Sequence, residues 1–236
     1  MAQFNKRVWT SVFVQPEDAG FAVYLDKRGL MTPGRAPLLL PTKALAQGIA
    51  AEWEAVAEKV NPADMPLTRA ANSAIDKVTP QHKAVADMLA EYGATDLLCY
   101  RAAQPEDLIA YQAAHWDAHL HWAAQEFGAR LRVQAGVMPI EQPPDSVARL
   151  GAAVAACDAF HLTALHDLVT ISGSLVLGLA VLRGRLNADE AFDLSRLDAA
   201  WQANLWGADD EAQRAAANHR RDMRAAAHML DLLKEA

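Results

Sequence analysis

The stretch VWTSVFVQPEDAGFAVYL, residues 8–25, decides the fold class of this chain. Residues alternate between two faces over Val8–Val14 and again over Phe21–Leu25, and a period of two is typical of β-strands. The segment 16–20, which contains a proline and a glycine, separates the two runs and predicts a hairpin whose loop is longer than two residues. With a short apolar strand at Leu38–Leu40, the first 40 residues are predicted to form a small antiparallel sheet.

After Pro41 the period of the apolar residues becomes helical. Thr42 is a good N-cap for a helix that continues to Val60, where Asn61 and Pro62 end it. A brief strand is expected at Asp96–Arg101. The other expected helices are Leu67–Val78, one from Thr79 to Gly93, Pro105–Phe127, Asp145–Cys157, Phe160–Leu182, Asn187–Leu205 and one from about Asp209 to Leu233.

These elements predict an α+β fold, with a small antiparallel β-containing N-terminal part followed by a mostly helical C-terminal part. The β-rich start has too few residues to hold a core alone, so it is expected to pack on the first helices. We therefore predict two domains: residues 1–100, which contain the sheet and its flanking helices, and residues 101–236, which are all helical.

Charge and motifs exclude several function classes. The 236 residues carry 22 Lys and Arg against 29 Asp and Glu, a net charge of −7, which is the wrong sign for a nucleic-acid binder. No phosphate-binding glycine motif and no nucleophile elbow occur, so neither a nucleotide nor a cofactor is expected. The longest apolar run, Leu168–Leu182, is shorter than the roughly 20 residues of a membrane span. Cys99 and Cys157 stand alone, and we interpret both as core residues.

Histidines offer one alternative, a metal-dependent helical enzyme. His115 and His119 are four residues apart on a predicted helix, so both imidazoles could face one ion. His121 points to another side of the helix, and no H-E-x-x-H motif is present. The pair also lies in an aromatic stripe with Tyr111 and Trp122, which packing explains equally well.

An acidic cluster follows the predicted helix Asn187–Leu205 and the pair Trp206-Gly207. Asp209, Asp210 and Glu211 follow Gly207, which ends this helix, after one intervening residue, and they begin the last helix. Carboxylates are favoured at the positive end of a helix, so capping is one interpretation. The other interpretation is that this partly exposed acidic turn, with Trp206 beside it, binds a partner protein.

Several longer motifs carry a family resemblance. They stand in order along the chain as GFAVYLD (20–26), LPTKALA (40–46), AEWE (51–54), MPLTRAANSAID (65–76), DLLCYR (96–101) and the pair Trp206-Gly207. In sequence, order and spacing they resemble the ATP synthase F1 assembly chaperone family that acts on the alpha subunit. The resemblance extends over nearly the whole chain.

The resemblance implies a binding protein rather than an enzyme. Members of that family bind the unassembled F1 alpha subunit, prevent its aggregation and hand it over to the beta subunit. They have a functionally important acidic residue just after the Trp-Gly pair, which here corresponds to Glu211 or, one position earlier, Asp210. Because the chain has no Arg- and Ser-rich presequence, we expect a bacterial cytoplasmic protein, or a mature mitochondrial matrix form if the source is eukaryotic.

Overall fold

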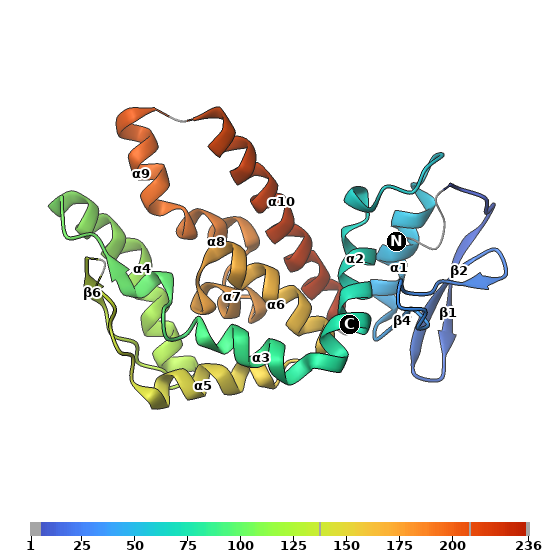
Figure 1. Ribbon diagram of the computed structural model, residues 1–236, viewed down its shortest axis with the longest axis horizontal. Helices are drawn as coiled ribbons and strands as arrows, with labels where there is room; N and C mark the ends of the chain where they lie inside the picture. Colours follow the sequence, from blue (N-terminus) through green and yellow to red (C-terminus); the bar gives the residue numbers. More distant parts are fainter. Residues whose placement is uncertain (1–5, 137, 208, 235–236) are drawn as a thin grey trace. The chain divides into compact units, whose positions relative to one another are not determined.

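The computed structural model describes residues 6–136, 138–207 and 209–234, which form two compact units (Figure 1). Unit 1 takes in the chain up to His82, residues 159–164 and the chain from His228 onward. Unit 2 consists of residues 83–158 and 165–227. Each unit is described by itself.

The sheet of unit 1 is built on an antiparallel hairpin. Strands β1 (Val12–Glu17) and β2 (Gly20–Leu25) pair in a register that runs from Val12 opposite Leu25 to Glu17 opposite Gly20. Only two residues therefore connect the strands, and the longer predicted loop was wrong. Pro16 is tolerated inside β1 because β1 is an edge strand, where a missing N–H costs little.

Strand β2 lies at the centre of the sheet. Two short strands, β3 (Arg28–Gly29) and β4 (Leu39–Leu40), also pair with it in antiparallel fashion. Gly20 is required at the crossing with β4, because a Cβ at its φ of +148° would collide with the carbonyl oxygen of Leu40. The predicted antiparallel sheet is confirmed.

Helix α1 (Lys43–Glu54) packs against β1 and β2. The Thr42 hydroxyl accepts a hydrogen bond from the Leu45 N–H at 3.2 Å, which confirms the predicted N-cap. The helix ends at Glu54 and not at Val60 as predicted. The guanidinium of Arg7 donates to the carbonyls of Glu54 and Val56 at 2.7 and 2.8 Å, so it satisfies groups that a continuing helix would use.

The next segment changes helix type without a break. After a 3₁₀ turn, η1 (Pro62–Asp64), it consists of α2 (Pro66–Ser73), the π-helix η2 (Ala74–Val78), the 3₁₀ turn η3 (Thr79–Gln81) and α3 (His82–Glu91). Thr79 keeps helical dihedrals, φ −53° and ψ −51°, so the predicted separation there does not occur.

Unit 2 contains the remaining helices and a small parallel ladder. The predicted strand at residues 96–101 is a 3₁₀ turn, η4 (Leu97–Cys99), followed by β5 (Tyr100–Arg101), which pairs with β6 (Gln134–Ala135). Helices α4 (Glu106–Glu126) and α5 (Pro144–Ala155) agree with the predicted ones to within two residues.

Two predicted long helices are each divided in two. The first consists of α6 (Ala159–Ser172) and α7 (Leu175–Leu182), because Gly173 has a φ of +71° and Ser174 caps α7. The second consists of α8 (Ala188–Ser195) and α9 (Leu197–Trp206), which break at Arg196 with a φ of −107°. The last helix, α10, spans Asp210–Leu233.

The α+β class and the order of sheet before helices are confirmed. The boundary near residue 100 stays a prediction, because compactness does not show which part folds alone. Within the described ranges no helix is both long and apolar enough to cross a membrane.

Candidate functional site

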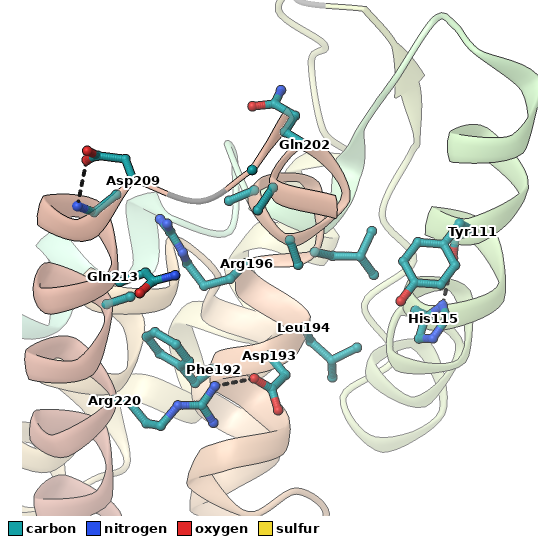
Figure 2. Close-up of a pocket in the computed structure, with 17 residues that line it drawn as sticks. Tyr111, His115, Phe192, Asp193, Leu194, Arg196, Gln202, Asp209, Gln213 and Arg220 are labelled. Atoms are coloured by element: carbon teal, nitrogen blue, oxygen red, sulfur yellow. Dashed lines mark hydrogen bonds and ion pairs between the residues drawn. The ribbon is translucent and has the colours of Figure 1, made fainter. Parts of the chain in front are cut away.

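Unit 2 carries an open groove of about 740 Å³ between α9 and the start of α10 (Figure 2). We call it the α9–α10 groove. Polar or aromatic side chains line it from three parts of the chain: Tyr111 and His115 from α4; Asp193, Arg196 and Gln202 from the α8–α9 segment; and Asp209, Gln213 and Arg220 around the first half of α10.

The groove is open because alanines line both of its helices. Ala199, Ala200 and Ala203 lie on α9, and Ala212 and Ala216 on α10. Protein interiors are close-packed by side chains that interdigitate, and a methyl group reaches too short a distance to do this. The helical propensity of alanine nevertheless keeps both segments helical. The sequence thus builds two stable helices with a space between them.

The first half of α10 is exposed on nearly every side. Residues 210–215 and 217–219 are exposed, and only Ala216 among residues 210–219 is half-buried. Toward its other end the helix becomes amphipathic, with Met223 and Ala226 buried. A surface helix normally buries an apolar stripe, so the exposed half-helix is a surface to which another chain can bind.

Ion pairs between α8 and α10 fix the floor of the groove. Arg220 donates to Asp193 and, at 3.1 Å, to Asp189, while Arg224 donates to Asp189 at 2.8 Å. The Arg220 guanidinium also lies 4.5 Å from the centroid of the Phe192 ring. Hydrogen bonding from Arg224, followed by that from Arg220, lowers the pKa of Asp189. Hydrogen bonding to Asp193 raises the pKa of Arg220, so Asp189 and Arg220 stay charged near neutral pH.

Helix α4 holds the α8–α9 corner from the other side. Gln112 donates to Asp198 at 2.7 Å, and the indole N–H of Trp116 donates to the carbonyl of Leu194 at 3.0 Å. The rings of Tyr111 and Trp201 are 5.4 Å apart. These contacts attach the α8–α9 segment, and with it one wall of the groove, to α4.

The acidic cluster divides into one capping residue and two free carboxylates. Asp209 accepts a hydrogen bond from the Ala212 N–H at 2.9 Å, so it caps α10. Asp210 and Glu211 are exposed in the first turn and make no hydrogen bond or ion pair with the described residues. Trp206 is the last residue of α9, and its side chain lies outside what the structure describes. A role for these four residues in partner binding stays a prediction.

The two histidines have different surroundings. His115 is exposed, with Nδ1 2.8 Å from the carbonyl oxygen of Tyr111 and its ring 4.2 Å from the Tyr111 ring. His119 is half-buried, and burial lowers its pKa, as does the nearby charge of Arg185. Among the described residues, no three His, Cys, Asp or Glu side chains are grouped so that they could hold a metal ion.

Neither cysteine has the surroundings of a nucleophile. Burial raises the pKa of Cys99 to about 12, and burial also raises the pKa of Cys157. A thiol reacts as the thiolate, so raised pKa values keep both groups unreactive at neutral pH. Cys99 is a core residue as predicted, whereas Cys157 is only half-buried.

Comparison with known proteins now gives the family. The family model described as "ATP12 chaperone protein" matches residues 6–124, half of the chain. The chain belongs to the ATP12 chaperone family. This is a family of chaperones rather than of enzymes, and its members act in the assembly of F1-ATPase. The family predicted from the sequence motifs is therefore confirmed.

Solved structures extend the similarity over the whole chain. Atp12 from Paracoccus denitrificans is 53% identical with a TM-score of 0.96, and the match covers 98% of this chain and 99% of that one. The Atu1473 protein from Agrobacterium tumefaciens is 40% identical with a TM-score of 0.93, covering 97% and 86%. Protein atp12, mitochondrial, from Schizosaccharomyces pombe is 24% identical over 88% of this chain and 75% of its own length. The groove helices α8–α10 lie beyond the family-model match but within the structural one.

Sequence reasoning found the acidic turn but not the groove beside it. The signal was present as alanines four residues apart at 212 and 216 and again at 199 and 203. Alanine is common on ordinary helix faces, so this spacing alone does not distinguish an open groove from close helix packing. Arg196 and the Asp193–Arg220 pair were also missed, because they are brought together only by tertiary structure.

Proposed function

We propose that this ATP12-family chaperone binds the unassembled F1 alpha subunit, prevents its aggregation and hands it over to the beta subunit. The observation that supports this most directly is the exposed first half of α10 beside the α9–α10 groove. A free alpha subunit exposes surfaces that the assembled enzyme covers, and large apolar patches of this kind aggregate. A chaperone must cover them temporarily.

The groove and the acidic turn suit different parts of such a surface. The alanine-lined walls can receive large apolar side chains, which carry most of the binding energy in protein interfaces. Asp210 and Glu211 lie between the lining residues Asp209 and Ala212 in sequence, and their free carboxylates can pair with basic side chains of the client. Charged groups at an interface rim mainly set specificity and association rate.

Release requires only competition. A standard interface of about 1,600 Å² spans micromolar to picomolar affinities, so a chaperone can bind the alpha subunit more weakly than the beta subunit does. The beta subunit then displaces it without nucleotide hydrolysis. The two bacterial structures and the mitochondrial relative support a place in the bacterial cytoplasm, with the mitochondrial matrix as its eukaryotic equivalent.

Co-expression with the alpha subunit from the same source tests the proposal. The soluble alpha subunit is measured with and without this chain, and co-elution is followed on a sizing column before and after addition of the beta subunit. We expect a soluble complex that the beta subunit dissociates. An alpha subunit that stays insoluble, with nothing co-eluting, would overturn the proposed client.

A further inference from the structure

Unit 1 contains a second cavity, of about 430 Å³, on one side of the α2–η2 segment. We call it the unit 1 cavity. Its apolar lining includes Leu30 and Leu38 from the loop region between β3 and β4, Trp53 from α1, and Met65 at the start of α2. Ligand pockets span about 300–1,000 Å³, so this one suits a short segment with one or two side chains rather than a whole helix.

A hydrogen-bonded frame holds one wall of this cavity. The carboxylate of Asp76 accepts hydrogen bonds from the Thr32 hydroxyl at 2.6 Å and from the Gly34 N–H at 2.8 Å. A Cβ at Gly34 would lie only 2.6 Å from a carboxylate oxygen of Asp76, so glycine is needed for this close approach. The loop and the π-helix η2 are thereby fixed relative to each other. Single π-turns inside helices are frequent at functional sites.

Three polar side chains at the cavity, those of Asn72, Arg69 and Lys77, take no part in this hydrogen-bonded frame. The Oδ1 atom of Asn72 is buried and has no hydrogen-bond partner. Arg69 and Lys77 line the same cavity, are exposed, and make no hydrogen bond or ion pair with the described residues. Burial raises the pKa of Glu52, and the positive charge of Arg69 acts in the opposite direction without a direct ion pair between the two side chains.

The Glu52 carboxylate, on α1, is occupied by the start of α2. Glu52 accepts the N–H groups of Leu67 and Thr68 at 2.7 and 2.8 Å, and the Thr68 hydroxyl donates to it at 2.6 Å. These bonds satisfy the first turn of α2. Two cations and an unsatisfied acceptor are therefore left over at the edge of an apolar cavity. The Asp76 carboxylate lines the same cavity, but its oxygens already accept two hydrogen bonds, and Arg69 and Lys77 together outweigh its single negative charge. In a chain with a net charge of −7, this locally positive edge favours an acidic ligand.

We propose that the unit 1 cavity binds an extended segment of the F1 alpha subunit in which an acidic residue is next to a large apolar one. The apolar side chain fills the cavity, and the carboxylate pairs with Arg69 and Lys77. Rotation of the Asn72 amide turns its oxygen toward the bound backbone, where a peptide N–H donates to it. The inference rests on the proposed function for the identity of the client, and it adds a client contact distinct from the α9–α10 groove.

Overlapping 15-residue peptides that span the alpha subunit serve as probes, and their binding to the full-length chain is measured by fluorescence anisotropy. We expect the bound peptides to share an acidic residue beside a large apolar one. The double variant Arg69→Glu with Lys77→Glu reverses both charges at exposed positions, and it should weaken their binding at least about tenfold. The matched control, Lys27→Glu with Arg28→Glu, makes the same change at exposed positions outside the cavity and should bind as the unaltered chain does.

Asn72→Leu gives a second measurement, because it removes the unsatisfied oxygen while keeping the size of the side chain. It should preserve or raise thermal stability and weaken peptide binding several-fold.

If no peptide binds, or if the charge-reversed and control variants bind equally well, the proposal is overturned. An alpha subunit kept soluble by the unaltered chain and equally by the charge-reversed variant would overturn this contact and leave the proposed function standing. An alpha subunit that the unaltered chain itself does not keep soluble would count against the proposed function instead.

Discussion

Asp96 is a fully buried carboxyl group that connects two parts of unit 2. It accepts hydrogen bonds from the Ser174 hydroxyl at 2.7 Å and from the N–H groups of Val176 and Leu98 at 2.9 and 3.0 Å. Burial raises its pKa to about 6, although the hydrogen bonds act in the opposite direction. Desolvation of the charge therefore outweighs three donors.

This pKa predicts a pH-dependent stability. The folded state binds the Asp96 proton more tightly than the unfolded state, whose pKa is near 3.8, so stability falls as pH rises between these two values. The loss amounts to about 1.4 kcal/mol per pH unit and about 3 kcal/mol in total. We expect Asp96→Asn to lack this loss, so its free energy of unfolding relative to the unaltered chain should rise from pH 4 to pH 6.

Urea unfolding at pH 4, 5, 6 and 7 measures this difference. Asp107→Asn, at an exposed position, is the control and should follow the unaltered chain. Parallel pH profiles for Asp96→Asn and the unaltered chain would contradict the argument.

Glu211 is the residue at which the proposed client binding is tested most directly. Its side chain is exposed, so Glu211→Lys should cost only the 0.3–1 kcal/mol of a cation at a helix N-terminus. Affinity for the alpha subunit should fall about tenfold, because an attraction becomes a repulsion. Sizing chromatography and titration with the alpha subunit give the result, with Glu91→Lys, another exposed site, as control.

Variants of the neighbouring carboxylates separate binding from capping. Asp210→Lys compared with Glu211→Lys shows which position contacts the client. Asp209→Ala removes the cap of α10 and should lower stability by about 1 kcal/mol. Unchanged affinity in both lysine variants would exclude the acidic turn as a contact.

At the scale of elements, local signals predicted local structure well. The Thr42 cap joins residues three apart, and the sequence shows both partners together. The break at Gly173 and Ser174 is different, because the Asp96 that accepts the Ser174 hydroxyl is 78 residues away. Apolar periodicity continues through that break, so it predicts one helix. The acidic turn was found because its residues are adjacent, while the groove arises from helices whose spacing no local pattern fixes.

The α9–α10 groove predicts the effect of filling it. Ala216→Trp places a large side chain on the groove wall, where there is room for it, so stability should change by no more than about 0.5 kcal/mol. Binding of the alpha subunit should fall at least about tenfold if apolar client side chains occupy this space. Ala217→Trp is exposed and outside the groove lining, and it should bind normally. The yield of soluble alpha subunit on co-expression compares the two, and equal yields would exclude the groove.

At the scale of the whole molecule, the end of the chain belongs to the unit that contains its beginning. The Thr42 hydroxyl, which caps α1, donates to the carbonyl of Leu232 at 2.6 Å, and Leu230 and Met229 are buried. Residues from His228 onward are thus part of unit 1, although they are far from the sheet in sequence. The predicted first domain, residues 1–100, does not include this closing segment, and its boundary stays a prediction.

Leu230→Ala measures how much this closing segment contributes. Removing a fully packed leucine side chain costs about 2–5 kcal/mol, a large part of the 5–15 kcal/mol typical of a domain. Leu205→Ala removes the same atoms from a side chain that is 60% exposed, so it should cost less than about 0.5 kcal/mol. Urea unfolding of the two variants gives the comparison.

Equal midpoints would show that unit 1 is stable without this segment, and a fragment of residues 1–100 should then fold on its own. If Leu230→Ala unfolds at clearly lower urea, that fragment should be far less stable than the full chain, because it lacks a part of its core.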